Sequence, residues 1–324
     1  MIKMEDYAII YNPEAGKGKG ATKDITLMEN CLKELNVSYK LFDTEYMRHA
    51  IELGGQLAKE GYRVIGAGGD GTCNEVMNGV ITSNTGALCG FIPMGSGNDI
   101  PAAIGIRPDI RRACEIIAEC NTGKSDIGFA KTDTGIERYF LGIGSQGFDS
   151  DVTRRFNEAK RGKSYVTQTL KAILPWKSRQ IMVTMDNDIY EGYANLLACA
   201  NGPSYGGFMY ICQRAQVNDG LFHVNIVDIG KFKLLKHFNR MYKATLLPHP
   251  DIYEYTSKKV RVQMLDPEEP KPYLCQVDGE ILDAVPVNYD CIKDGYEFIR
   301  PKKDEVAEAF KKEHGRYFWD CNYD

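Results

Sequence analysis

The sequence lacks several features that would place it in a membrane, secreted or metal-binding class. It contains no run of about 18 apolar residues, the length that a membrane-spanning helix needs. Residues 1–6 lack the apolar segment of a signal peptide. Ten cysteines are scattered singly, with no Cys-x-x-Cys pair and no Cys/His cluster at zinc-ligand spacing. We therefore expect a cytoplasmic protein with reduced thiols, and any contact with a membrane to be peripheral.

The chain also lacks an excess of positive charge. It has 40 Lys and Arg residues and 44 Asp and Glu residues, which gives a formal net charge of -4. This balance argues against general nucleic-acid binding, because such proteins present a basic surface to the phosphate backbone. The length of 324 residues suits two domains better than one.

The first third of the sequence alternates between strand-like and helix-like patterns. Apolar runs at 7–11, 64–67 and 87–92 predict strands, and the segments between them carry helical periodicity. This alternation favours a parallel sheet with helices on both faces. Glycine-containing turns follow all three runs, and ligands of such sheets bind beyond the carboxyl ends of the strands. We therefore expect the three turns to converge on one edge of the sheet.

The run Gly68-Gly69-Asp70-Gly71-Thr72 is the most informative of these turns. It lies between a predicted strand and a helix that we expect to begin at Cys73. Glycines allow a ligand to approach the backbone, and a helix N-terminus attracts anions such as phosphate. The alternative is an ordinary tight turn in which Thr72 caps the helix.

The pattern changes near residue 121 to short β-rich segments separated by turn residues, which predicts an antiparallel β domain. The charged stretch Asp304–His314 is helical in pattern and is expected to pack back on the protein. The predicted boundaries are 1–122 for an α/β domain, 123–300 for a β domain and 301–324 for the tail.

Four ordered motifs resemble those of the bacterial diacylglycerol kinase-type lipid kinases, which are related to sphingosine and ceramide kinases. They are Asn12-Pro13 with Gly16 and Gly18, Gly68–Glu75, Pro93–Asp99, and Val277-Asp278-Gly279-Glu280. The resemblance implies a Rossmann-like α/β domain of the NAD kinase and diacylglycerol kinase type, followed by an antiparallel β-sandwich domain. It places the active site in the cleft between them. It also implies ATP and Mg²⁺ as co-substrates and transfer of the γ-phosphoryl group to a lipid hydroxyl, with diacylglycerol converted to phosphatidic acid.

The same resemblance assigns the nucleotide contacts to the N-terminal domain. The implied residues are Asn12, Pro13, Gly16, Thr44, Gly68, Gly69, Asp70, Gly71, Thr72, Asn74, Glu75, Gly95, Ser96 and Asn98. Lys17 and Lys19 would either offset phosphate charge or lie in a solvated loop.

The resemblance brings four carboxylates, Asp70, Asp99, Asp278 and Glu280, to one catalytic site. Clustered carboxylates repel one another unless Mg²⁺ or lysines compensate their charge. Asp278 resembles the proton acceptor of the bacterial enzymes, and Asp70 resembles the residue given that role in sphingosine kinases. The structural alternatives are an Asp-Gly hairpin turn at Asp278 and helix capping by Asn98 or Asp99.

A structural Mg²⁺ site is implied at Gln216–Leu221. It would use the carboxylate of Asp219 and the backbone carbonyls of Gln216 and Leu221, and oxygen ligands of this kind suit Mg²⁺. The alternative is an Asn-Asp-Gly hairpin turn.

Two segments are candidates for contact with a membrane that holds the lipid substrate. In 231–247, Lys233, Lys236, Arg240 and Lys243 fall on one helical face, with apolar residues on the other. The alternative is a helix packed on its own domain with a solvated basic face. The second segment is Lys160–Tyr165.

Two other functions stay open at this stage: an NAD kinase-like phosphotransferase, and a non-catalytic protein that binds nucleotide or lipid. The sequence leaves open the acceptor lipid and whether the chain forms a homodimer.

Overall fold

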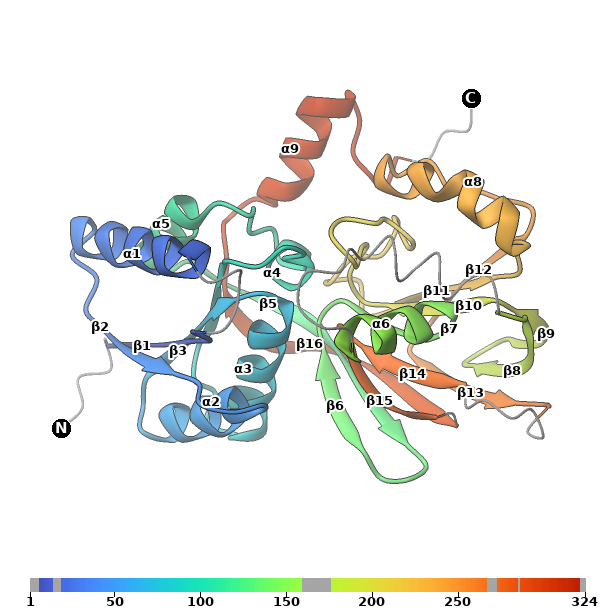
Figure 1. Cartoon of the computed structure of the whole chain (residues 1–324), viewed down its shortest axis with the longest axis horizontal. Coiled ribbons are helices and arrows are strands. Elements are labelled where there is room, and N and C mark those ends of the chain that lie inside the picture. The colour runs from blue at the N-terminus through green and yellow to red at the C-terminus, as the bar shows by residue number, and fades with distance from the viewer. Residues whose placement is uncertain (1–5, 14–18, 159–175, 267–272, 285, 321–324) are drawn as a thin grey trace. The chain divides into compact units, whose positions relative to one another are not determined.

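The computed structural model describes residues 6–13, 19–158, 176–266, 273–284 and 286–320 (Figure 1). The chain divides into two compact units, which we call unit 1 (Met1–Ser125 and Asp294–Tyr317) and unit 2 (Asp126–Lys293 and Phe318–Asp324). The sequence-based boundaries at 122 and 300 treat each domain as one continuous segment, whereas the chain returns to unit 1 at Asp294.

Unit 1 is built on a parallel sheet with the strand order β2-β1-β3-β4. The last part of β16 lies beside β4, also in parallel, through the pair Phe298 and Cys89. The central strands are almost wholly buried because helices cover the sheet. The strands are β1 (Tyr7–Tyr11), β2 (Tyr39–Asp43), β3 (Arg63–Gly68), β4 (Cys89–Pro93) and β16 (Val287–Ile299). The predicted parallel α/β domain is confirmed.

Six helices of unit 1 are described: α1 (Lys19–Glu34), α2 (His49–Lys59), α3 (Asp70–Thr82), α4 (Asp99–Ala103), α5 (Ile110–Glu119) and α9 (Glu305–His314). In α1, Met28 and Leu32 are buried, one turn apart on the side that faces the core. Leu35 lies just beyond the end of the helix and is exposed.

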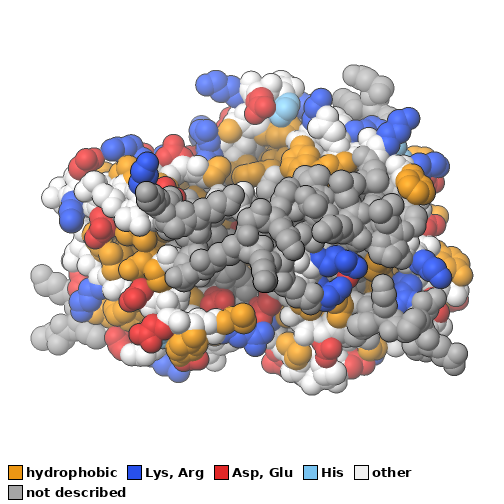
Figure 2. All heavy atoms as spheres, viewed as in Figure 1, with side chains coloured by type: hydrophobic (Ala, Val, Ile, Leu, Met, Phe, Trp, Pro, Cys, Tyr) orange, Lys and Arg blue, Asp and Glu red, His pale blue; other side chains and the backbone are white. Residues whose placement is uncertain are grey.

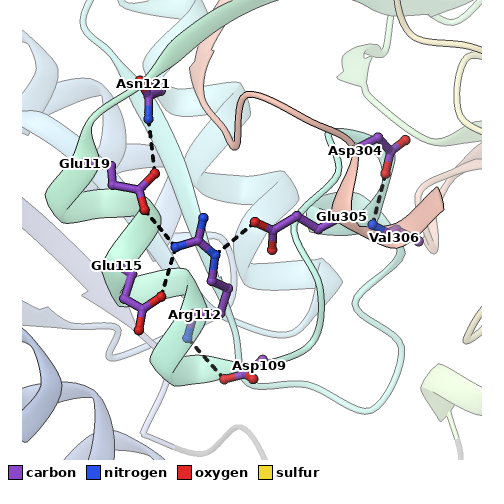
Figure 3. Close-up of polar contacts among 8 residues, drawn as sticks. All are labelled: Asp109, Arg112, Glu115, Glu119, Asn121, Asp304, Glu305 and Val306. Atoms are coloured by element: carbon purple, nitrogen blue, oxygen red, sulfur yellow. Dashed lines mark hydrogen bonds and ion pairs between the residues drawn. The ribbon is translucent and has the colours of Figure 1, made fainter. Parts of the chain in front are cut away.

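The C-terminal helix α9 is tied to α5 by one arginine (Figure 3). The guanidinium of Arg112 pairs with Glu115 at 2.9 Å and Glu119 at 2.7 Å on its own helix, and with Glu305 of α9 at 2.9 Å. Asp304 caps α9 by accepting from the backbone N–H groups of Val306 and Ala307. The helix predicted in the tail is therefore an integral part of unit 1.

Unit 2 contains a six-stranded antiparallel sheet with the order β12-β11-β10-β7-β14-β15. Its strands are β7 (Ile143–Gly147), β10 (Leu196–Ala200), β11 (Phe222–Val227), β12 (Ile252–Ser257), β14 (Leu274–Val277) and β15 (Glu280–Ala284). Two helices of this unit are described, α6 (Phe148–Glu158) and α8 (Lys231–Tyr242).

A second group of antiparallel strands covers this sheet. The first part of β16 pairs with β13 (Lys259–Met264), which pairs with β8 (Arg179–Met185), which pairs with β9 (Ile189–Ala194). Strand β5 (Thr122–Thr132) pairs with β6 (Glu137–Phe140). Phe140 lies 5.6 Å from Phe222 and 5.8 Å from Tyr289 between ring centroids, so both groups contribute to one aromatic core. The predicted β-sandwich domain is confirmed.

None of the helices in the described ranges is both long and apolar enough to cross a membrane.

Candidate functional site

The strand register of unit 1 aligns the ends from which the glycine turns start. Tyr11 is opposite both Asp43 and Ala67, and Ala67 is opposite Ile92. The strands are parallel, so the residues that follow them lie along one edge of the sheet. Two backbone hydrogen bonds extend the alignment: the N–H of Thr44 donates to Tyr11 O at 3.0 Å, and that of Met94 to Gly68 O at 2.8 Å.

The turns after β3 and β4 pack against each other through their backbones. A Cβ atom added at Gly95 would lie 2.4 Å from the Cα of Gly69, and one added at Gly97 would lie 2.4 Å from Oδ2 of Asp70. Both distances are shorter than side chains tolerate, so glycine is required there by packing.

Asp70 joins these two turns. Its Oδ2 accepts from the N–H of Asn98 and its Oδ1 from the N–H of Ile100, each at 2.8 Å. Burial, together with the neighbouring charge of Asp99, raises the pKa of Asp70 to about 6, although the two backbone bonds oppose the shift. The carboxylate thus fixes the geometry of the glycine-rich edge as well as carrying charge there.

Helix α3 begins at Asp70, three residues before the predicted start, and Gly69 is its N-cap. The alternative in which Thr72 caps this helix is therefore wrong, because Thr72 lies inside the first turn. The backbone N–H groups at the start of α3 lie directly after β3, where an anion would meet them.

Asn98 is the N-cap residue of α4, as one of the structural alternatives expected, but its side chain makes no capping hydrogen bond. Asn98 instead holds its own turn closed: its Oδ1 accepts from the N–H of Gly95 at 2.9 Å, and its Nδ2 donates to the carbonyl of Gly95 at 2.8 Å. The backbone N–H groups at the start of α4 are those that the Asp70 carboxylate accepts.

The remaining predicted nucleotide residues differ in exposure. Pro13, Gly71 and Ser96 are exposed, and Asn12, Thr44 and Glu75 are half-buried. Asn74 is buried and accepts from the side chain of Asn78 at 3.1 Å, which gives it a packing role. Gly16 and Lys17 lie outside the described residues, as does the side chain of Lys19.

Asp278 lies in unit 2, at the tip of the hairpin formed by β14 and β15. Its φ is 47° and that of Gly279 is 86°, which matches a two-residue type I′ turn. The hairpin expected as the structural alternative is therefore present. The carboxylate of Asp278 also accepts three backbone N–H groups, from Leu141 at 2.9 Å and from Gly142 and Ile143 at 3.0 Å. These amides fix its position at the start of β7.

Glu280 follows this turn and forms a bidentate ion pair with Arg138 of β6, at 3.0 and 3.1 Å. Both side chains are about one-fifth exposed, at 18% for Arg138 and 22% for Glu280, so the pair is shielded from water. Sequence reasoning did not identify Arg138, which carries no motif of its own.

The loop proposed to hold structural Mg²⁺ has one carboxylate at its centre. Oδ1 of Asp219 accepts from the N–H of Leu221 at 2.9 Å, and Oδ2 lies 3.3 Å from Nε2 of His223. The buried Asp126 accepts from the N–H of Gly220 at 2.6 Å and anchors the turn. Gln216 is exposed. Among the residues that the structure describes, no three His, Cys, Asp or Glu side chains gather where they could hold a metal ion.

The neighbouring carboxylates of Asp70 and Asp99 in unit 1 nonetheless suit a hard cation. The charge of Asp99 disfavours ionisation of Asp70, and a divalent cation beside them would relieve that repulsion. Carboxylate oxygens and phosphate oxygens are the ligands that Mg²⁺ prefers. The residues present at this edge therefore fit the metal that accompanies a nucleotide.

Helix α8 carries exposed lysines on one side and packs on unit 2 through part of the other. Lys233, Lys236 and the C-cap residue Lys243 are exposed, and Arg240 is half-buried. Met241 is buried, Phe238 packs on the core of unit 2 and Tyr242 is exposed. The side chains of Leu234 and Leu235 lie outside the described residues. Figure 2 shows Lys and Arg side chains gathered at the upper right, where Figure 1 draws α8. At Phe238 and Met241 the helix therefore packs on its own domain, as the alternative expected. The segment Lys160–Tyr165 lies outside the described residues.

The fold and the two sites define a class of proteins in which a Rossmann-like unit with a glycine-rich edge is combined with a β sandwich. Residues 6–130 match the diacylglycerol kinase catalytic domain. Residues 142–299 match the YegS C-terminal NAD kinase beta sandwich-like domain. The chain belongs to the bacterial diacylglycerol kinase-type family of lipid kinases.

Curated relatives agree with this family over nearly the whole chain. The diacylglycerol kinase of Staphylococcus haemolyticus is 27% identical over 325 residues, which cover 95% of this chain and 92% of the relative. That of Staphylococcus saprophyticus is 27% identical over 313 residues, which cover 93% and 98%. A crystal structure of a diacylglycerol kinase from Bacillus anthracis strain Sterne has a TM-score of 0.72 at 22% identity, with 92% of this chain and 98% of that chain covered.

Proposed function

We propose that this protein is an ATP-dependent lipid kinase that transfers the γ-phosphoryl group to the hydroxyl of diacylglycerol and forms phosphatidic acid. The observation that carries the proposal is the glycine-rich edge of unit 1 in a chain that matches the diacylglycerol kinase catalytic domain. Two relatives that the chain matches over 92% and 98% of their length are both named diacylglycerol kinase, which favours diacylglycerol over other lipid alcohols.

Unit 1 is the proposed nucleotide-binding part. Phosphate groups are expected at the backbone N–H groups of the turns after β1, β3 and β4 and at the start of α3. Asp70 and Asp99 are proposed to hold the Mg²⁺ that accompanies the triphosphate, and the metal would neutralise charge on the transferred group. Asn12, Thr44, Glu75 and Ser96 are the proposed side-chain contacts along the same edge.

Asp278 is the proposed proton acceptor. The lipid hydroxyl oxygen forms a bond to the γ-phosphorus, the bond from that phosphorus to the β–γ bridging oxygen breaks, and ADP leaves. The hydroxyl proton passes to the Asp278 carboxylate. Three amide donors hold this carboxylate in place, and phosphoryl transfer depends mainly on such positioning because little charge develops on the attacking oxygen. Glu280 is proposed to steady the turn through its pair with Arg138.

Asp70 is the competing candidate for that role. Its raised pKa of about 6 suits a general base at neutral pH. Both of its carboxylate oxygens already accept from backbone N–H groups, those of Asn98 and Ile100, which favours a role in fixing the second glycine turn over proton transfer.

The test is an assay with labelled ATP, Mg²⁺ and diacylglycerol in mixed micelles, with other lipid alcohols and NAD as parallel acceptors. Labelled phosphatidic acid supports the proposal. Phosphorylation of NAD instead of lipid would support an NAD kinase-like enzyme, and ATP binding without transfer to any acceptor would support a non-catalytic binding protein.

We also propose that α8 brings the enzyme to anionic membranes. Lys233 and Lys236 on the helix and Lys243 at its C-cap are exposed, and the exposed Phe232 at its start would enter the interface. Lys233→Glu with Lys236→Glu should weaken sedimentation with vesicles rich in phosphatidylglycerol and leave binding to neutral vesicles unchanged. Unchanged binding to the anionic vesicles would contradict this role.

The loop around Asp219 is the proposed structural Mg²⁺ site, with the carbonyls of Gln216 and Leu221 as further ligands. If it binds Mg²⁺, the metal should raise the Tm of the wild type and not that of Asp219→Ala in the absence of nucleotide. An equal rise in both would contradict the assignment.

A further inference from the structure

A line of buried hydrogen bonds runs through unit 2 behind the Asp278–Gly279 turn. Oε1 of Gln276 accepts from the N–H of Gly279 at 2.7 Å. Nε2 of Gln276 donates to Oγ of Ser145, and Oγ of Ser145 donates to Oδ2 of Asp149. The line therefore leads from the first turn of α6, through β7, to the hairpin that carries the proposed proton acceptor.

Every side chain in this line is shielded from water. Ser145 is 0% exposed, Gln276 is 1% exposed and Asp149 is 4% exposed. Hydrogen bonds in such an environment are strong, and a broken link leaves a buried polar group without compensation. The other carboxylate oxygen of Asp149, Oδ1, is buried and has no hydrogen-bond partner among the described residues.

The donors and acceptors fix the direction of the line. The N–H of Gly279 requires an acceptor, so the amide of Gln276 must present its oxygen to Gly279 and its nitrogen to Ser145. Ser145 then accepts from Gln276 and has its single proton available for Asp149. The orientation of the Gln276 amide is thus set from both ends.

The strand register places the Gln276 amide between Ser145 and the Asp278–Gly279 turn. Gln276 is opposite Ser145 in the β14–β7 ladder, and the N–H of Asp278 donates to the carbonyl of Ile143 at 3.1 Å. Ile143 therefore accepts from the backbone N–H of Asp278, while the N–H groups of Gly142 and Ile143 donate to the Asp278 carboxylate.

We propose that Gln276 is a positioning residue for Asp278, and that Ser145 and Asp149 hold it in the required orientation. This inference rests on the proposed function, because it assumes that Asp278 accepts the proton. Gln276 fixes the amide of Gly279, so the turn keeps the conformation in which the Asp278 carboxylate reaches the amides of Leu141, Gly142 and Ile143. Loss of Gln276 leaves that amide without its acceptor and lets the turn shift.

Asp149, at the far end of the line of hydrogen bonds, is its titratable member. Burial raises the pKa of Asp149 to about 7, although the hydrogen bond from Ser145 opposes the shift. Tyr273 and Tyr289 are the titratable groups that feel its charge, and burial raises the pKa of both further above the ordinary tyrosine value, so both stay neutral in the same range.

The test compares Gln276→Met with Gln276→Glu. The methionine variant has a similar length and loses both hydrogen bonds, so we expect kcat to fall about tenfold or more with the KM for ATP unchanged. The glutamate variant reproduces the amide only when its carboxyl is protonated, since the acid O–H can then donate to Ser145 while the other oxygen accepts from Gly279. Its kcat relative to wild type should therefore recover as the pH falls.

Asn225→Leu is the matched control, because Asn225 is also a buried amide of unit 2 and donates to the carbonyl of Ile211 at 2.6 Å. It lies on β11, two strands from β7 in the same sheet. A loss of kcat in Gln276→Met no greater than in Asn225→Leu at equal Tm would overturn the proposal. So would a glutamate variant whose relative kcat does not rise at low pH.

Hydrogen exchange of the Gly279 amide separates this inference from the proposed function. Exchange should accelerate in Gln276→Met and stay at the wild-type rate in Asn225→Leu. If the wild type transfers no phosphate to any lipid, the proposed function fails, and the exchange rates still decide whether Gln276 orders the turn. Unchanged exchange in Gln276→Met would reject the ordering role directly.

Discussion

Replacing Asp70 with asparagine should change how the stability of the protein depends on pH. In the folded protein the pKa of Asp70 is raised from its usual value of 3.8 to about 6, by burial first and by the charge of Asp99 second. The folded state therefore binds this proton more tightly than the unfolded state does. The free energy of unfolding contributed by Asp70 falls as the pH rises from about 4 to about 6.

The size of the effect follows from the shift. A difference of about 2 pKa units at 1.36 kcal/mol each corresponds to a loss of about 3 kcal/mol above pH 6, relative to pH below 4. Asparagine does not titrate and shows no such loss. It retains an acceptor for only one of the N–H groups of Asn98 and Ile100, which adds a cost of about 1–3 kcal/mol that does not depend on pH.

The assay is urea unfolding of both proteins between pH 4 and pH 8. The stability of the wild type minus that of Asp70→Asn should be largest at low pH and should decline by about 3 kcal/mol by pH 7. Asp109→Asn, which alters an exposed capping carboxylate of the same unit, controls for the loss of one charge. A difference that stays constant, or grows with pH, would refute the account of Asp70.

Three further substitutions test the remaining contacts. Gly97→Ala puts a Cβ 2.4 Å from Oδ2 of Asp70 and should destabilise the protein by about 1–3 kcal/mol and weaken ATP binding; Gly71→Ala, whose Cβ meets nothing within 4 Å, is the stability control. Asp278→Asn keeps a residue that tolerates positive φ, so the fold and ATP binding should persist while turnover falls by roughly 10²–10⁴-fold; near-normal turnover would move the proton acceptor to Asp70. Arg138→Met leaves the carboxylate of Glu280 without its bidentate partner and should cost about 1–2 kcal/mol in thermal unfolding, and no measurable loss would mean that the pair does not stabilise the turn.

The sequence predicted the parallel sheet of unit 1 well because its strands are short apolar runs that end in glycine turns. The runs at 7–11 and 64–67 correspond to β1 and β3 within a residue. It missed the start of α3 because Gly-Asp-Gly does not indicate a helix, although Asp70 already has helical geometry in the structure. Tertiary packing of the second glycine turn against Gly69 overrides the local preference.

The chemistry of the candidate site was harder to predict for a different reason. The residues themselves were recognisable, but their partners lie far along the chain. The amide of Asn98 is 28 residues from Asp70, Arg138 is 142 residues from Glu280, and Ser145 is 131 residues from Gln276. No local pattern marks Arg138, Asp126 or Gln276, because each contact depends on strand register that only the folded chain reveals.

The central claim is that this chain phosphorylates a lipid hydroxyl, and identification of its product in a total lipid extract tests it most directly. The extract is incubated with the purified protein, labelled ATP and Mg²⁺, and labelled products are identified by mass. The account predicts phosphatidic acid as the main labelled lipid, with Asp278→Asn giving none above background. An extract with no labelled lipid, from protein that is folded and binds ATP, would contradict it.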